Sequence, residues 1–447
     1  MHTSSNLELY QWAIACALVV GATGCDDGPR APALSLNEGI VKIAPVPPEN
    51  GPQLGVVSKV VQVREYSDPT ARSVGALHAG ARVPRSTEPV SRHRCAGGWY
   101  AVRPRGFVCV GVEATLDLKH PTLAAMALAP SRDADLPYTY ARAKVETPVF
   151  ERVVDQDDAV REVGRFRRRA GMAVVGSWRA KEPSGVDSRL ALLTDGHFVR
   201  ASDLEAAKPS EFDGVELGKQ ADLPLAFVVK RGVRSFRLNG GDAEKGDLLE
   251  YHADLPLSGR FRTLGKLKYW AYPGRGEELW VRHQDVTVVQ KRTAFPDFVR
   301  EDTRWLDVSI TTGTLVAYEG KRAVFATLLS VARELPEGET RTASDPSIPL
   351  GTVTVRSKAL SLAGVVPQLG EPFEVADAPW ALELSSGQLI HGAYWHDRFG
   401  IEHGAGTLEL SPRDAARVFR FVGPELPPGW HAVSALPEPA ARVVLRK

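Results

Sequence analysis

The residues with the clearest chemical potential lie in the C-terminal third of the chain. His391 begins the run HGAYWHDRFG, and Thr407 lies a few residues further on, in the run GAGTLELSPRDA. A hydroxyl attacks a carbonyl carbon when a base such as histidine takes its proton and when donors stabilise the oxyanion that forms. His391 and Thr407 are side chains of the two types that such chemistry uses.

Short β-strands are predicted to position these two side chains. The run from Trp305 alternates apolar and polar residues, a hairpin tip follows at 319–322, and Val324 begins the return strand. A short helix is predicted after Ser411, because this N-cap residue is followed by Pro412 at the first helical position. The C-terminal region is thus expected to be mainly β with short helices.

Three motifs of this region resemble those of the L,D-transpeptidase (YkuD) domain. The family's first hairpin is similar to residues 308–330, its TPxG turn to residues 348–351, and its HGxYWHxxFG motif to residues 391–400. The resemblance extends over residues 295–434 and implies an L,D-transpeptidase-like β-sandwich. The activity that it implies is acyl transfer between peptidoglycan stem peptides, with a cysteine as the nucleophile.

The chain departs from the family pattern where the nucleophile is expected. In the register of the family motif SHGC, Ala405 takes the place of the histidine, Gly406 is retained and Thr407 takes the place of the cysteine. A thiol with a pKa of about 8.5 ionises readily beside a histidine, whereas a branched hydroxyl is far less acidic. The resemblance implies His391 as the base, with Gly392 beside it, and a degenerate nucleophile position at Thr407.

The other site residues are expected to contact substrate. The resemblance implies such contacts from Tyr394, Trp395, Gly406 and Glu409, where Glu409 replaces an asparagine or arginine of the family. The histidines of this region lack the spacing of a zinc site, and there is no Walker loop or dinucleotide-binding fingerprint. The sequence therefore predicts neither a metal nor a cofactor.

Residues 1–25 resemble a bacterial lipoprotein signal. The apolar stretch that ends at Thr23 is too short to span a membrane, and the residues up to Cys25 resemble a lipobox. Lipid modification of Cys25 is expected, although an ordinary secretory signal or a misplaced start codon would also fit. Residues 26–53 are rich in proline and alanine, so we expect a flexible linker.

Two further cysteines, Cys95 and Cys109, lie in the part of the chain expected to fold. An even pair in an exported protein predicts a disulfide, which stabilises by roughly 2–4 kcal/mol. Two buried free thiols are the alternative.

The middle of the chain is predicted to hold small β modules. Residues 54–117 contain the hairpin text GWYAVRPRGFVC and resemble bacterial Src-homology-3-like domains, which are small barrels. Two later modules are expected at 136–206 and 222–291, because residues 198–204 and 280–286 share the pattern aromatic-Val-Arg-x-x-Asp-aliphatic. The fold class is therefore mainly β, with tandem small barrels ahead of the C-terminal domain.

Composition excludes several classes of protein. The 447 residues include 55 Lys and Arg against 54 Asp and Glu, so no basic excess favours nucleic acid. No apolar run reaches the roughly 18–20 residues of a spanning helix. With the signal, these features predict a lipid-anchored protein of the periplasm-facing cell envelope, and they leave open which membrane carries the anchor.

Three functions follow from the sequence. The first is a binder of peptidoglycan stem peptides with little or no catalysis. The second is an active acyltransferase or hydrolase that uses Thr407 with His391 as base. The third is a structural adaptor whose small modules bind the wall, with envelope proteins as further partners.

Overall fold

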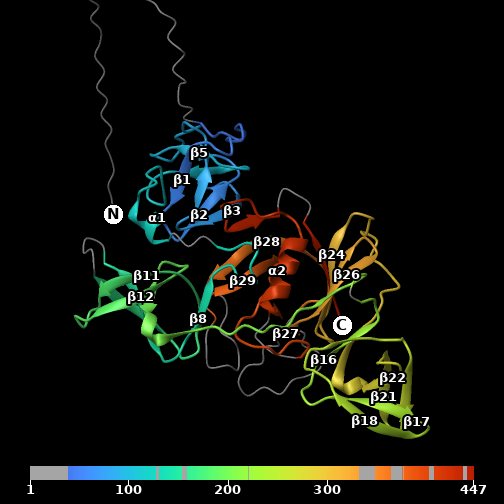
Figure 1. The fold of residues 1–447 in the computed structure, drawn as a ribbon. Coiled ribbons are helices and arrows are strands. Elements are labelled where there is room, and N and C mark those ends of the chain that lie inside the picture. The colour runs from blue at the N-terminus through green and yellow to red at the C-terminus, as the bar shows by residue number, and fades with distance from the viewer. Residues whose placement is uncertain are drawn as a thin grey trace, which may run out of the picture. The chain divides into compact units, whose positions relative to one another are not determined.

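The computed structural model describes residues 39–126, 130–153, 159–219, 221–331, 348–363, 375, 377–401, 407–435 and 440–447. Residues 37–447 form one compact unit. The described residues fold into many short strands and two α-helices (Figure 1), so the prediction of a mainly β chain is confirmed. No helix in these ranges combines the length and apolar character that a membrane crossing requires.

The N-terminal region, which contains the predicted Src-homology-3-like module, has short strands and one helix. These are β1 (Gln53–Val56), β2 (Val60–Arg64), β3 (Ser73–His78), β4 (Arg82–Pro84), β5 (Trp99–Ala101), β6 (Phe107–Cys109), β7 (Ala114–Thr115) and α1 (Pro121–Ala125).

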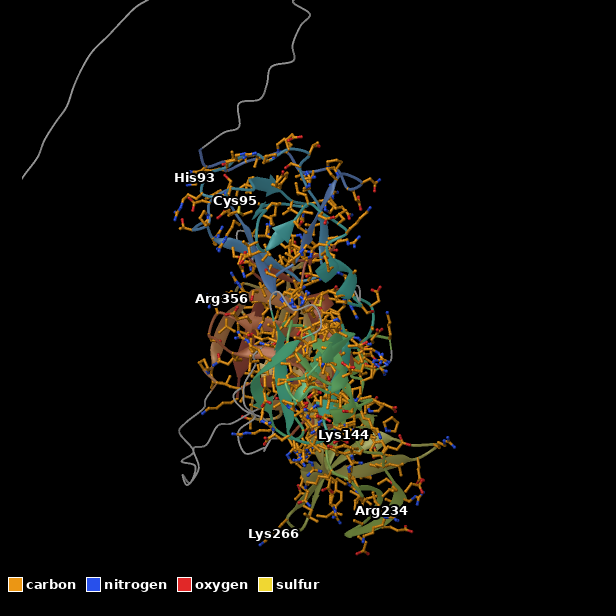
Figure 2. All side chains as sticks on the ribbon, turned by 90° about the vertical axis from the view of Figure 1, so that its left-hand side faces the viewer. His93, Cys95, Lys144, Arg234, Lys266 and Arg356 are labelled. Atoms are coloured by element: carbon orange, nitrogen blue, oxygen red, sulfur yellow. A yellow bond between two sulfur atoms is a disulfide. The ribbon has the colours of Figure 1, made fainter. Side chains whose placement is uncertain are left out.

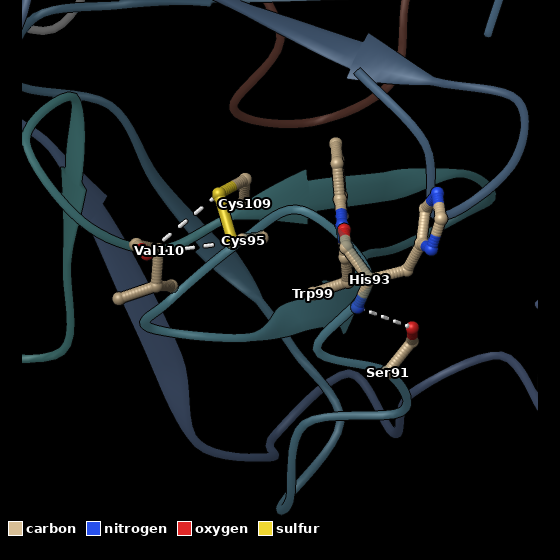
Figure 3. Close-up of a disulfide and its surroundings, with 6 residues drawn as sticks. All are labelled: Ser91, His93, Cys95, Trp99, Cys109 and Val110. Carbon is tan, nitrogen blue, oxygen red and sulfur yellow. Dashed lines mark hydrogen bonds between the residues drawn. A yellow bond between two sulfur atoms is a disulfide. The ribbon is translucent and has the colours of Figure 1, made fainter. Parts of the chain in front are cut away.

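The predicted disulfide between Cys95 and Cys109 is confirmed. Its two Cα atoms are 6.0 Å apart, and Trp99 lies next to it in the same apolar cluster (Figure 3). The Trp99 indole Nε1 donates to the backbone oxygen of His93 at 2.7 Å. The labels of His93 and Cys95 mark this part of the chain in Figure 2. The disulfide thus closes the loop that leads into the β5–β6 hairpin.

Residues 39–52, within the segment expected to be a linker, contact this N-terminal region. The backbone of Val41 exchanges hydrogen bonds with Ser67, accepting from its N–H at 3.0 Å and donating to its Oγ at 2.6 Å. The Arg103 guanidinium donates to the backbone oxygen of Pro47 at 3.1 Å. The proline-rich residues 39–52 therefore lie along the surface of the N-terminal region as far as β1.

The middle of the chain contains two groups of strands. The first group is β8 (Thr139–Ala143), β9 (Thr147–Arg152), β10 (Val160–Phe166), β11 (Gly171–Lys181), β12 (Asp187–Leu193), β13 (Phe198–Arg200), the 3-10 turn η1 (Ala201–Asp203) and β14 (Leu204–Ala206). The second group is β15 (Val215–Glu216), β16 (Leu225–Val228), β17 (Arg234–Asn239), β18 (Asp242–Leu248), β19 (Asp254–Pro256), β20 (Phe261–Leu264), β21 (Leu267–Pro273), β22 (Glu278–Arg282), the 3-10 turn η2 (His283–Asp285) and β23 (Val286–Val289).

The repeated sequence pattern folds in the same way in both groups. Each copy is a strand, a 3-10 turn and a second strand, namely β13–η1–β14 and β22–η2–β23. The arginine guanidinium of each copy stands over an aromatic ring of the neighbouring strand, Arg200 over Phe150 at 5.7 Å and Arg282 over Phe236 at 4.6 Å. The repeated arginine therefore has a packing role in both copies.

The C-terminal region holds the strands that carry the candidate site. They are β24 (Arg304–Ser309), β25 (Thr314–Glu319), β26 (Arg322–Leu328), β27 (Ser330–Val331), β28 (Gly351–Ala363), β29 (Asp377–Leu384), β30 (Leu389–Gly392), β31 (Leu408–Leu410), α2 (Pro412–Phe421), β32 (Ala432–Ser434) and β33 (Arg442–Arg446).

Strand β24 separates two apolar clusters because its side chains alternate. Leu306 and Val308 belong to the cluster that includes residues of β29–β31 and α2, whereas Trp305 faces the other way and stacks on Tyr318 at 4.5 Å. The predicted hairpin is confirmed as β25 and β26. The helix predicted after Ser411 is confirmed as α2, and the Ser411 Oγ accepts from the N–H of Asp414 at 3.1 Å.

The sheets of the described ranges do not close into barrels. Strands β5 and β10 each pair with one neighbour and end their sheets. The N-terminal region instead joins the C-terminal one, because β3 pairs with β32 at Gly75 and Val433. Small closed barrels, as expected from the sequence, are thus replaced by open sheets, one of which runs through both ends of the chain.

Candidate functional site

The candidate site is built on three neighbouring strands of the C-terminal region. Parallel pairing of β30 and β31 places His391 opposite Glu409, and antiparallel pairing of β27 and β31 places Ser330 opposite the same residue. Residues paired in this way project from the same face of a sheet. Ser330, Glu409 and His391 therefore form one row, and each is at most 1% exposed.

His391 has the geometry of a base. Its Nδ1 lies 3.1 Å from the carbonyl oxygen of Gly392, which only accepts, so this nitrogen carries the proton. The other nitrogen, Nε2, is then an acceptor, and it is buried with no hydrogen-bond partner among the described residues. Burial lowers the pKa of His391, and the nearby Glu409 carboxylate opposes this shift. The side chain is thus a neutral imidazole with a free lone pair.

Glu409 binds two other site residues. One carboxylate oxygen accepts from His396 Nε2 at 2.8 Å, and the other accepts from the Thr407 hydroxyl at 3.4 Å. The Nδ1 of His396 accepts from the N–H of Arg398 at 3.0 Å, so Nε2 is the protonated nitrogen of that ring. Thr407 itself is 4% exposed. The hydroxyl at the nucleophile position is therefore directed towards a carboxylate.

The two aromatic residues of the predicted site have different surroundings. The Trp395 ring lies 5.8 Å from that of His391, and its Nε1 is buried without a hydrogen-bond partner in the described part of the chain. The Tyr394 ring packs on Tyr140 at 4.4 Å, and a Cβ added at Gly171 would lie 2.5 Å from its hydroxyl oxygen. Trp395 is thus beside the row, whereas Tyr394 is packed against β8 and β11.

Gly392 has a packing role. A Cβ at this position would lie 3.2 Å from Pro379 Cγ and 3.3 Å from both Pro412 Cα and Ala415 Cβ. The absence of a side chain lets β30 approach the first turn of α2. Gly406, Ala405 and Cys25 lie outside the described residues.

Sequence reasoning missed Ser330. Its Oγ is buried and has no hydrogen-bond partner within the described ranges, as is also true of His391 Nε2 and Trp395 Nε1. Leaving a buried polar atom unpaired costs about 1–3 kcal/mol, so such atoms usually meet a polar partner. The signal in the sequence was a serine at the end of an apolar strand. In the described residues no three His, Cys, Asp or Glu side chains come close enough to hold a metal ion.

Comparison with known proteins gives structural matches only. No protein-family model matches the sequence, and no curated protein matches it. An L,D-transpeptidase structure from Xylanimonas cellulosilytica is similar at 16% identity and a TM-score of 0.20, covering 34% of this chain and 64% of that one.

Two further solved structures are similar to parts of the chain. L,D-transpeptidase 1 of Mycobacterium tuberculosis matches at 19% identity and a TM-score of 0.23, covering 42% of this chain and 86% of its own. An L,D-transpeptidase from Mycobacterium smegmatis matches at 13% identity and a TM-score of 0.23, covering 55% and 89%. Each of these three identities is below 25%, and each TM-score is below 0.5.

Proposed function

We propose that the C-terminal region binds peptidoglycan stem peptides at the row Ser330, Glu409 and His391, with little or no catalysis. The observation that carries this proposal is the hydrogen bond from the Thr407 hydroxyl to Glu409, a carboxylate that also binds His396. The family resemblance of residues 295–434 supplies the class of ligand.

Polar atoms without partners support binding. His391 Nε2, Ser330 Oγ and Trp395 Nε1 are buried, and none has a hydrogen-bond partner in the described part of the chain. A peptide carries amide donors and carbonyl acceptors at every residue, so a bound stem supplies partners for all three atoms. An apolar ligand would leave them unpaired.

The chemistry of the site argues against efficient acyl transfer. A threonine hydroxyl attacks a carbonyl only after a base within about 2.6–3.2 Å has taken its proton. The Glu409 oxygen that faces this hydroxyl is 3.4 Å away. A carboxylate is also a far weaker base than an alkoxide, so it transfers little nucleophilic character to Thr407.

The N-terminal sequence supports a location in the cell envelope for this binding function. The text up to Cys25 resembles a lipoprotein signal, which would anchor the chain in a membrane by lipid. The disulfide between Cys95 and Cys109 is typical of an oxidising compartment such as the periplasm. The small modules ahead of the site would then hold wall components or envelope proteins.

Mass spectrometry tests the proposal directly. Residues 37–447 would be incubated with tetrapeptide muropeptides. The masses of the intact protein and of the muropeptides would then both be measured. We expect unchanged protein and unchanged muropeptides, together with saturable stem binding by calorimetry. Glu409→Gln should weaken that binding by about tenfold, whereas the exposed control Glu244→Gln should not.

Two results would overturn the proposal in different ways. An acyl adduct that disappears in Thr407→Ala, or any new crosslink, would identify an active enzyme. Absence of stem binding, with the folded state intact, would leave only the adaptor function.

A further inference from the structure

A cavity of about 400 Å³ lies away from the row of Ser330, Glu409 and His391. Its wall includes His78 at the end of β3, Leu123 of α1, and Trp430 and His431 ahead of β32. This volume is within the range of about 300–1,000 Å³ that is typical of sites for small molecules.

The polar part of the wall contains two stacked histidines. The rings of His78 and His431 are 3.3 Å apart between centroids and nearly parallel. His431 Nε2 donates to the carbonyl oxygen of Ser361, so its Nδ1 accepts from the Tyr138 hydroxyl at 3.2 Å. His78 Nδ1 is buried and has no hydrogen-bond partner among the described residues. The wall therefore presents a polar atom that a ligand can satisfy.

The charge of the wall is positive. The half-buried Arg132 donates to the backbone oxygens of Leu426, Pro427 and Trp430. Burial lowers the pKa of Arg132, and the carboxylates of Glu425 and Asp133 oppose that shift. A guanidinium that is held by carbonyls keeps its full charge. Arg82 also lines the cavity, and its described lining includes no Asp or Glu.

Both histidines of the wall are neutral, so its positive charge comes from Arg132 and Arg82. Burial lowers the pKa of His78 to about 2, and His431 and Lys59 lower it further. The buried Asp377 lies behind this wall and has both carboxylate oxygens bound, one by Thr194, which lines the cavity, and one by Ser361. Its hydrogen-bond acceptors are thus already used within the protein.

We propose that this cavity binds a small organic anion with an apolar body. Its acidic group would lie beside Arg132 and the free nitrogen of His78. Its body would pack on Leu123, Met126 and Trp430, which line the same cavity. An anion gains from the positive charge of Arg132, and the apolar body gains from leaving water. This site is separate from the one proposed for stem peptides.

A pair of naphthalene dyes tests both halves of the proposal. 8-Anilinonaphthalene-1-sulfonate has an apolar body and an anionic group, and N-phenyl-1-naphthylamine has nearly the same body without the charge. Fluorescence titration would use residues 37–447 with Arg132→Gln, Arg132→Lys and the cavity-filling Ala79→Leu. Arg300→Gln is the matched control, since the Arg300 guanidinium also binds backbone oxygens but lies elsewhere.

The anionic dye should bind saturably, and Arg132→Gln should weaken it by about tenfold, because a hydrogen bond to a charged group is lost. Arg300→Gln should change the binding by less than about threefold. Arg132→Lys keeps the charge but not the planar donor group, so it should weaken the binding less than Arg132→Gln does. Ala79→Leu should weaken the binding of both dyes by about tenfold, because the larger side chain fills part of the cavity.

Three results would overturn the proposal. The first is no saturable binding of the sulfonate up to about 1 mM. The second is an equal loss of affinity for both dyes in Arg132→Gln, which would mean that the charge of the dye plays no part in binding. The third is unchanged binding in Ala79→Leu, which would place the dye elsewhere. The thermal unfolding midpoint of each variant shows whether a loss of dye binding is caused by a loss of folded protein. If Arg132→Gln does not fold, Ala79→Leu still tests the site.

Discussion

At the scale of single residues, the candidate site combines a neutral histidine with a threonine hydroxyl that is bound to a carboxylate. His391 has the neutral tautomer that a general base requires, and its Nε2 is free of hydrogen-bond partners among the described residues. Thr407 instead donates to Glu409. The decisive residue is therefore Glu409, because its negative charge opposes the formation of an anionic nucleophile next to it.

A cysteine at position 407 makes this effect measurable. We expect Thr407→Cys to react slowly with iodoacetamide, because burial and the Glu409 carboxylate both raise the pKa of a thiol. Adding Glu409→Gln should accelerate the reaction by about tenfold at neutral pH, since one opposing charge is removed. Mass spectrometry of the alkylated protein gives both rates.

The native cysteines do not compete for the reagent in this experiment, and a matched control variant exists. In residues 37–447 the native cysteines are Cys95 and Cys109, which are bonded to each other. Thr407→Cys with Glu244→Gln removes a charge from an exposed position instead. Equal rates in all three proteins would show that Glu409 does not control the charge at position 407.

At the scale of elements, a buried carboxylate connects strands that are distant in sequence. Asp377 of β29 accepts hydrogen bonds from Ser361 of β28 and from Thr194, which follows β12. Burial raises the pKa of Asp377 from 3.8 to about 6. This shift corresponds to a free energy of about 3 kcal/mol by which the folded state favours the protonated form of Asp377.

The sign of this shift sets a dependence of stability on pH. Because the folded state holds the Asp377 proton more tightly than the unfolded chain does, the stabilisation is complete below about pH 4 and is lost as the pH rises through about 6. Relative to Asp377→Asn, the wild-type protein should lose unfolding free energy between these values. Urea unfolding across this range measures the difference, and a constant difference would contradict the prediction.

Local features of the elements were predictable, and long-range pairing was not. The helix after Ser411 and the hairpin of β25 and β26 follow from capping, alternation and turn residues close in sequence. The row of the site depends on Ser330 pairing with Glu409, 79 positions away, and a two-residue strand carries no periodic signal. His391 was found because its motif is local, whereas Ser330 was not.

At the scale of the molecule, close packing at Gly75 joins the two ends of the chain. Gly75 of β3 pairs with Val433 of β32, and a Cβ there would lie 2.3 Å from the Trp430 ring and 2.5 Å from the backbone oxygen of Ala432. Only glycine permits this approach. The first module and the C-terminal region should therefore unfold together.

Gly75→Ala should disrupt the pairing of β3 with β32. We expect it to lower the free energy of unfolding by about 1–3 kcal/mol, as overpacking does, and to separate the unfolding of the two regions. Differential scanning calorimetry resolves one transition from two. Gly111→Ala is the control, because a Cβ there meets no atom within 4 Å. A single transition at an unchanged temperature in Gly75→Ala would contradict the prediction.

The position of β33 has a consequence for synthesis of the protein. This strand lies between β24 and β28, parallel to the first and antiparallel to the second. During translation, β24 and β28 are synthesised well before residues 442–446, so one edge of each lacks the strand that will separate them. Unpaired edges attract other strands. Until β33 has been synthesised, these two edges are therefore open to pairing with the wrong strand.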